Sequence, residues 1–271
     1  MLRHKQQSMC IQLVSSANVE GPAAEAHTRL RSLREWTPVL VRGTLKAREA
    51  AKSDTHLGMK LIPDREIAVE HIQPLNDISE DIVIKDDTVF GQDQRHLQLR
   101  TDADLRENIL FRAKTVTRAR LHLNSCEFRE IETPILFKST PEGAREFLVP
   151  TRQKGLAYAL PQSPQQYKQI LMASGFTQYY QFARCFRDED LRADRQPEFT
   201  QLDMEMSFAG EEDVIAEVEQ LLRTLWDHML NLKVPETFQR MTYREAMASY
   251  GSDKPDLRYK AKVRAVNVEL L

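Results

Sequence analysis

Two apolar segments separated by a charged loop constrain this chain more than any other feature. Residues 179–186 and 199–208 both have the composition of strands, and acidic and basic side chains alternate through the loop between them. Two such segments joined by one loop predict an antiparallel hairpin. The hairpin is therefore expected to concentrate charge at the end where its loop lies.

Each strand of this hairpin separates two kinds of side chain, because successive residues of a strand point to opposite faces. In the second strand one face is expected to carry Leu202, Met204, Met206 and Phe208, and the other Phe199, Gln201, Asp203 and Glu205. In the first strand Gln181, Ala183, Cys185 and Arg187 share a side, opposite Phe182, Arg184 and Phe186. The small Ala183 and Cys185 leave room above the sheet, which favours a polar pocket. A solvated surface hairpin is the alternative.

Composition bounds the remaining possibilities. A formal net charge of −2 over 271 residues gives no general attraction to nucleic acid or to anionic membranes. The cysteines Cys10, Cys126 and Cys185 are odd in number and far apart, so neither a disulfide framework nor a structural zinc site is expected. No run of about 18 apolar residues exists, so no membrane span is predicted.

The chain divides into two domains in this interpretation. Residues 1–75 form a β-rich unit with strands expected at 9–16, 39–45 and 66–72, and residues 76–100 are an acidic linker. Residues 101–271 then begin with a helix capped by Thr101 or Asp102. The apolar side chains expected to face the core are Leu105, Ile109, Val116 and Leu123. The basic residues on its other face indicate a solvated surface, with RNA or partner contact as the alternative.

Several further elements follow from local signals. A strand over 126–137 is interrupted at Pro134, which lacks a backbone donor and belongs at an edge or bend. Ser163 followed by Pro164 predicts a helix start that places Ser163, Gln165 and Lys168 on the first turns. Later helices are predicted from the acidic residues at 211–213 and from the capping-box spacing at 242–245. The apolar stripe expected on the first of these contains Val214, Val218, Leu221, Leu225, Trp226 and Met229.

The polar side chains expected near the hairpin suit a zwitterionic amino acid beside a nucleotide. The guanidinium of Arg187 offers a flat, two-pronged donor for phosphate or carboxylate, which a lysine cannot match. The carboxylate of Asp203 suits an ammonium group, and the ring of Phe199 suits a purine face. The sequence contains no P-loop and no GxGxxG motif, so side chains on the sheet would have to hold the nucleotide.

Residues 128–208 resemble the class II aspartyl-tRNA synthetases of the bacterial and mitochondrial type. The matching runs are residues 140–145 (TPEGAR), 159–165 (ALPQSPQ) and the whole of 187–203, and residues 243–258 continue the match. Residues 9–75 resemble only the later strands of the family's anticodon-binding OB-fold. The resemblance implies an α+β fold, in which a partial OB-like β-barrel precedes part of an antiparallel class II catalytic sheet with flanking helices.

The same resemblance implies a role for each matched position. Glu142 corresponds to the acid of the loop that closes over the amino acid, and Asp203 to the group that holds its α-ammonium. Ser163, Gln165 and Lys168 match the aspartate-binding segment, with Lys168 neutralising the side-chain carboxylate. Arg187 matches the arginine that bridges the amino-acid carboxylate and the α-phosphate of ATP. Glu189, Gln196 and Phe199 match ATP-binding positions, with Phe199 stacked on adenine.

The family's third motif, with its second ATP-binding arginine, is expected downstream of Arg258 and is not found, and no glycine follows Gly251. The acids that bind Mg²⁺ belong to the same part, so no metal ligand is assigned in this chain. The loss of one charge-stabilising donor typically costs about 10²–10³ in rate. We therefore expect an aspartate–tRNA ligase fragment with little activity by itself. A pairing of Asp203 with Lys168 could also be a structural salt bridge.

Partners and location follow from the same resemblance. It implies aspartate, ATP and tRNA(Asp) as substrates, Mg²⁺ in the full-length enzyme, and a homodimer formed through the region around Pro134. The alternatives are a non-catalytic protein that binds tRNA or a synthetase, and a relative specific for asparagine or lysine. The first 19 residues are basic and rich in serine, which predicts either a transit peptide and the mitochondrial matrix or an ordinary start and a cytoplasmic location.

Overall fold

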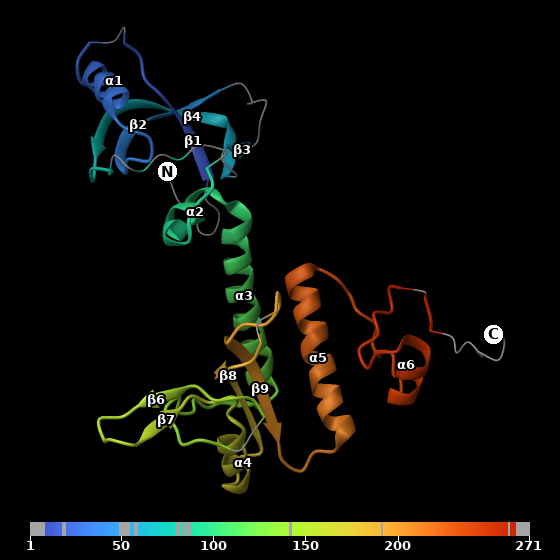
Figure 1. Ribbon diagram of the computed structural model, residues 1–271. Helices are drawn as coiled ribbons and strands as arrows, with labels where there is room; N and C mark the ends of the chain where they lie inside the picture. Colours follow the sequence, from blue (N-terminus) through green and yellow to red (C-terminus); the bar gives the residue numbers. More distant parts are fainter. Residues whose placement is uncertain are drawn as a thin grey trace, which may run out of the picture. The chain divides into compact units, whose positions relative to one another are not determined.

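The protein is described by a computed structural model that covers residues 9–17, 20–48, 55–56, 59–79, 82, 84, 88–140, 143–190, 192–259 and 261–263. It is an α+β chain that separates into two compact units, Met1–Arg112 and Ala113–Leu271 (Figure 1). The boundary between these units falls inside a helix.

The first unit is built on a four-stranded sheet in the order β1-β4-β2. Strand β1 (Met9–Val14) runs parallel to β4 (Met59–Pro74), while β2 (Val39–Ala47) and β3 (Thr55–His56) pair with β4 in antiparallel fashion. The three predicted strands are confirmed, and β4 is longer than expected. Among the described strands this sheet is open, with β1 and β2 at its edges. The region expected to be a partial OB-like barrel is therefore an open sheet in its described part.

The helix that follows β1 in the first unit was not predicted from the sequence. Helix α1 (Pro22–Ser32) begins with a proline in its first turn, and its Ala26 packs in a small core with Val69 and Ile72 of β4. Its surface is largely polar, and Ala26 is its one buried side chain among the described residues. A helix that buries so narrow a stripe gives little apolar periodicity to read.

A short helical region connects this sheet to the long helix α3 (Ala103–Ser125). The 3₁₀ turn η1 (Gln92–Gln94) and helix α2 (Arg95–Thr101) lie at the end of the segment expected to be a linker. The carboxylate of Asp102 accepts a hydrogen bond from the backbone N–H of Leu105 at 2.8 Å, and this bond lowers the pKa of Asp102. The predicted cap of α3 is thereby confirmed at Asp102.

The second unit contains the predicted hairpin. Strands β8 (Gln178–Phe186) and β9 (Glu198–Met206) pair in antiparallel fashion over their whole length, and β5 (Arg129–Glu130) runs parallel to β8. The strand expected over 126–137 is reduced to β5, after which Phe137 bridges Ala159. This Ala159 ends β7 (Ala157–Ala159), which pairs with β6 (Leu148–Pro150). The proline at 134 lies between the two contacts, where the chain leaves the sheet.

The core of this unit lies where the last turns of α3 and the middle of α5 (Glu211–Leu230) meet the hairpin (Figure 1). Its fully or nearly fully buried members are Ala119, Leu123, Phe128, Tyr180 and Leu221. Ile109, expected in the core stripe of α3, is 52% exposed because only the later turns of that helix reach this core. Of the stripe predicted on α5, Leu221 and Leu225 join the core, while Val214, Val218 and Trp226 are at least 40% exposed.

The helix that carries Lys168 starts later than predicted. Helix α4 (Gln165–Ala173) has Pro164 as its N-cap, because the carbonyl of Pro164 accepts the first helical hydrogen bond, from the N–H of Lys168 at 3.1 Å. Ser163 therefore precedes the helix and its side chain makes no cap. The predicted end is correct, since Gly175 follows the helix with a φ of +95°. The capping box of α6 (Tyr243–Tyr250) is also confirmed, with Thr242 and Glu245 bonded to each other.

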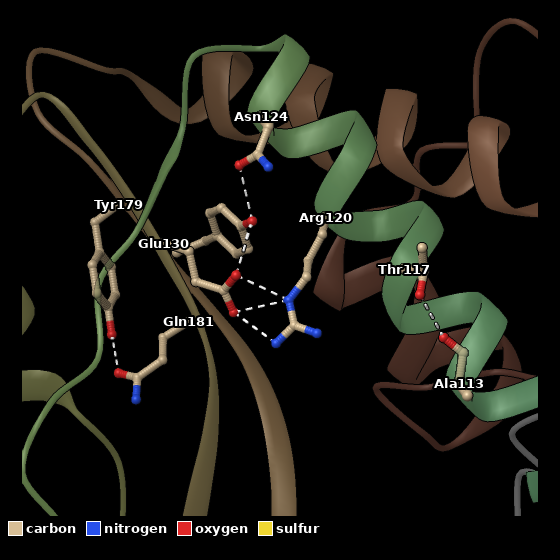
Figure 2. Close-up of polar contacts among 8 residues, drawn as sticks. Ala113, Thr117, Arg120, Asn124, Glu130, Tyr179 and Gln181 are labelled. Atoms are coloured by element: carbon tan, nitrogen blue, oxygen red, sulfur yellow. Dashed lines mark hydrogen bonds and ion pairs between the residues drawn. The ribbon is translucent and has the colours of Figure 1, made fainter.

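A polar network fixes α3 to the outer side of the sheet (Figure 2). The guanidinium of Arg120 donates to both carboxylate oxygens of Glu130 on β5, at 2.8–3.0 Å. The buried Tyr180 of β8 donates its hydroxyl to Asn124 at 3.0 Å and to Glu130 at 3.3 Å. These contacts join α3, β5 and β8, so the strand that carries the candidate site is held from behind by a helix.

Candidate active site

The two faces of the hairpin differ as the period of two predicts. Leu202, Met204 and Met206 pack against the core, while Gln201, Asp203 and Glu205 point to the opposite face. Across the ladder Gln181 pairs with Asp203, Ala183 with Gln201, and Cys185 with Phe199. The polar face predicted for both strands is thus one continuous surface. The candidate site is built on it.

A buried cluster of charges occupies one end of this face. The ammonium of Lys168, on α4, lies 3.1 Å from Asp203 Oδ1 and 3.1 Å from Glu205 Oε2. The side chains are 9%, 14% and 29% exposed respectively. Burial by itself lowers the pKa of Lys168, but its hydrogen bonds to Glu205 and Asp203 outweigh burial and raise that pKa. The lysine is therefore held as a cation.

This cluster has one carboxylate more than it has cations. Burial raises the pKa of Asp203, against the influence of Lys168, and the neighbouring Glu205 raises it further. Asp203 Oδ2 is buried and has no hydrogen-bond partner among the described residues. A buried carboxylate oxygen without a donor is costly. The arrangement thus offers a place for one more cationic donor.

A cavity of about 370 Å³ lies at the loop end of the hairpin. It is lined by Arg187, Glu189, Asp190, Asp194, Arg195, Gln196 and Phe199. The guanidinium carbon of Arg187 lies 5.2 Å from the centre of the Phe199 ring, and its Nε is buried without a partner among the described residues. Glu189 is held by Arg195 at 3.1 Å. The four residues predicted to bind ATP are therefore brought together around one space.

Cys185 connects the two ends of the face. Its thiol is fully buried and lies 3.2 Å from Gln201 Oε1. Burial raises the pKa of this thiol, the charge of Arg187 lowers it, and the charge of Asp203 raises it. By the alternation of the ladder, Cys185, Gln181 and its partner Asp203 share one side of the sheet, and Arg187, two residues after Cys185, continues that side. An amino acid and a nucleotide bound at the two ends would be neighbours.

The structure places the remaining predicted residues less centrally. Gln165 is the first residue of α4, and Ser163 lies before that helix, beside Phe137, Thr140 and Tyr167. Glu142 falls outside the described residues. Gln162 is a buried residue that was not predicted as part of the site. Its side-chain oxygen accepts a hydrogen bond from the backbone N–H of Ala144 at 2.8 Å, and its side-chain nitrogen donates to the carbonyl of Ala144 at 2.7 Å. Its position inside the matching run 159–165 is the sequence feature that could have indicated a role for Gln162 near the site.

Glu205 is the other residue that sequence reasoning left out of the site. Glu205 lies on the same polar face as Asp203 because side chains alternate along the strand. The alternation alone could therefore have placed Glu205 in the candidate site. In the part of the chain that the structure describes, no group of three or more His, Cys, Asp or Glu side chains is arranged to hold a metal ion. No described helix is long and apolar enough to cross a membrane.

Comparisons with known proteins identify the fold and the family of this chain. The asparaginyl-tRNA synthetase of Pyrococcus horikoshii, solved with asparaginyl-adenylate, has a TM-score of 0.66 at 24% identity, over 82% of this chain and 49% of that one. The aspartate–tRNA ligase of Thermosipho africanus is 48% identical over 260 residues, and the aspartate–tRNA(Asp/Asn) ligase of Dictyoglomus turgidum is 54% identical over 178. These alignments cover 91% and 65% of this chain, and 42% and 30% of the two ligases. The family model of the class II tRNA synthetases (D, K and N) matches residues 88–269, so the chain belongs to that family.

Proposed function

We propose that the protein to which this chain belongs is an aspartate–tRNA ligase. It would join aspartate to ATP, giving aspartyl-adenylate and pyrophosphate, and then transfer the aspartyl group to tRNA(Asp). The two aspartate–tRNA ligases named above support this proposal, but the chain spans only 42% of the length of the Thermosipho africanus ligase. Catalysis is accordingly proposed for the longer protein, and ligand binding is the property to test on this chain.

The observation that carries the proposal is Asp203 Oδ2, which has no hydrogen-bond partner among the described residues and belongs to a cluster of two carboxylates and one lysine. An α-ammonium group bound there would supply the missing donor and the missing positive charge. Lys168, Ser163 and Gln165 come from the segment before and within α4, and they would contact the side-chain carboxylate of aspartate. Glu142 would contribute from its loop.

ATP would occupy the cavity at the other end of the face. Phe199 would stack on the adenine, while Glu189 and Gln196 would hydrogen-bond the nucleotide. Arg187 would bind the α-phosphate together with the carboxylate of aspartate, where negative charge develops as the anhydride forms. Mg²⁺ is implied by the family, but the described residues contain no ligand set that fits it. No step is assigned to the metal here.

Calorimetric titration of the 271-residue chain tests this assignment. We expect L-aspartate to bind, and to bind more tightly than L-asparagine or L-lysine, because a buried lysine at 168 favours a side-chain carboxylate. Asp203→Asn should weaken aspartate binding by about tenfold or more, since a charge-assisted hydrogen bond contributes about 1.5–3 kcal/mol. Asp227→Asn, which changes an exposed aspartate of α5 away from both ends of the polar face, is the matched control. Tighter binding of asparagine or lysine than of aspartate would refute the assignment.

A homodimer through the region around Pro134 belongs to the same proposal. Ile135 and Leu136 are 44% and 51% exposed next to this proline, and a cavity of about 450 Å³ lies against it at the edge of β8. Exposed apolar groups beside a cavity suit a second protein surface. Leu136→Asp should raise the dimer dissociation constant at least tenfold in sedimentation equilibrium, whereas Leu75→Asp, 58% exposed in the first unit, should not. A monomeric parent chain at high concentration would contradict the proposal.

A mitochondrial matrix location stays a prediction from the composition of residues 1–19. Of these residues, Met9–Val14 form strand β1 of the first sheet. The two aspartate–tRNA ligases named above come from bacteria.

A further inference from the structure

Three consecutive backbone N–H groups at the end of β8 donate to three different segments of the chain. The pairs of donor and acceptor are Phe186 with Pro161 at 2.9 Å, Arg187 with Pro197 at 2.9 Å, and Asp188 with Arg145 at 3.0 Å. The bond of Arg187 belongs to the hairpin, since Pro197 lies directly before β9. The other two bonds hold the residues before and after Arg187 to segments outside the hairpin. The backbone position of Arg187 therefore depends on where those two segments lie.

The side chain of Gln162 joins those two segments. Its oxygen accepts from the N–H of Ala144 at 2.8 Å, and its nitrogen donates to the carbonyl of Ala144 at 2.7 Å. In an antiparallel pair two residues exchange both N–H···O bonds, and the amide of Gln162 reproduces this exchange with a side chain. Gln162 follows Pro161, and Ala144 precedes Arg145. The contacts thus form a closed ring that starts and finishes at the end of β8.

The bonds of Gln162 are buried, whereas the ion pair that accompanies them is exposed. Gln162 is 5% exposed, so water competes little with its bonds to Ala144. The guanidinium of Arg145 lies 3.8 Å from the carboxylate of Asp188, and these side chains are 82% and 45% exposed. Exposed ion pairs of this kind contribute little to stability. The position of residues 144–145 is therefore set by the amide of Gln162 and by backbone bonds.

The neighbouring β-hairpin does not depend on Gln162. The N–H of Leu160 donates to the carbonyl of Phe147 at 2.9 Å, and β6 pairs with β7 beyond this bond. These contacts involve backbone groups alone. Loss of the Gln162 amide is therefore expected to free residues 144–145 while β6 and β7 stay paired.

We propose that Gln162 is a positioning residue that fixes the backbone on both sides of Arg187, so that the guanidinium binds the phosphate of ATP in one orientation. The role rests on the proposed function, because it assumes that Arg187 binds a phosphate. A planar guanidinium makes two parallel bonds to a phosphate only when it is correctly oriented. The buried Nε of Arg187 has no partner among the described residues, so its direction depends on the backbone that carries it.

Gln162→Met tests the role, because methionine fills a similar volume but makes neither bond to Ala144. In calorimetric titration ATP should bind about tenfold more weakly, the effect of losing one hydrogen bond to a charged group. Adenosine, which has no phosphate, should bind as it does to the parent chain. In an Arg187→Lys background the same substitution should change ATP affinity by less than about twofold, since a lysine has no fork to orient. Gln169→Met, which changes an exposed glutamine of α4, is the matched control.

Two NMR measurements on the ligand-free chain test the positioning directly. In Gln162→Met the amide of Asp188 should exchange at least about fivefold faster, the equivalent of one neutral hydrogen bond, because its acceptor segment is released. The amide of Arg187, which bonds within the hairpin, should exchange at the parent rate. The Nε–Hε resonance of Arg187 should also move toward its position in Phe199→Leu, because a guanidinium that leaves the ring is no longer shifted by the ring's magnetic field.

The outcomes separate this inference from the proposed function. Equal losses of ATP affinity in the parent and Arg187→Lys backgrounds, or equal losses for ATP and adenosine, would overturn the role of Gln162 by showing a general defect of the cavity. An unchanged Arg187 resonance in Gln162→Met would overturn it too. If the parent chain binds no ATP while the Asp188 exchange and the Arg187 resonance change as described, the proposed function fails and the positioning of Arg187 by Gln162 holds.

Discussion

Replacing Lys168 by methionine is expected to destabilise the folded chain by about 3–5 kcal/mol, the typical cost of removing one partner of a buried ion pair. The ammonium of Lys168 lies 3.1 Å from both Asp203 and Glu205, and its side chain is only 9% exposed. Methionine preserves much of the packing but leaves two neighbouring carboxylates without a cation. Urea denaturation at about neutral pH measures the difference in the free energy of unfolding.

The pH dependence of this effect has a definite sign. The raised pKa of Lys168 means that its contribution is complete at neutral pH and is lost only as the pH rises through its folded value. The pKa of Asp203 is raised by burial, so the folded chain takes up that proton more readily than the unfolded chain. Without Lys168 the two acids become harder to ionise. The deficit of Lys168→Met should therefore shrink as the pH falls from about 7 toward about 4.

Two controls make this prediction specific. Lys154→Met changes an exposed lysine and should stay within about 0.5 kcal/mol of the parent chain. Adding Asp203→Asn to Lys168→Met removes one of the two stranded charges and should restore part of the lost stability. A Lys168→Met chain as stable as the parent at neutral pH would show that the cluster is not electrostatically coupled.

Arg187→Lys is expected to weaken ATP binding by about 10–100-fold, since hydrogen bonds to charged groups contribute about 1.5–3 kcal/mol. The positive charge is kept, so any loss reports on geometry. The guanidinium carbon of Arg187 lies 5.2 Å from the centre of the Phe199 ring, and the buried Nε of Arg187 has no partner among the described residues. A lysine has neither the planar fork nor this fixed donor.

Calorimetric titration with ATP compares this variant with Arg192→Lys, which changes an exposed arginine of the same loop and should bind as the parent does. Thermal unfolding without ligand serves as the check on folding. Equal ATP affinity in Arg187→Lys and the parent chain would mean that Arg187 acts only as a point charge. The nucleotide would then have to be positioned by other groups of the cavity.

The sequence by itself determined the hairpin and the division of its two faces. The reason is local: side chains alternate along any strand, so Leu202, Asp203 and Met204 could be assigned to faces before any contact was known. Capping signals are equally local, and Asp102 and Thr242 were found from them. The helix start predicted with Ser163 as its N-cap was one residue too early, because a proline fixes its own φ and does not decide which carbonyl accepts the first helical bond.

Only the tertiary structure decided which polar groups meet. Lys168 is more than thirty residues from Asp203 in the chain, and alternation could show that Glu205 shares the face of Asp203 but not that both acids bind one lysine. Thr133 reaches Gln181 across two segments that no local pattern joins. Such contacts depend on how helices and strands pack, and packing is set by the whole core rather than by any one stretch. The alternation of side chains along the strands placed the candidate site on one face of the hairpin. Tertiary packing determined which side chains contact one another on that face.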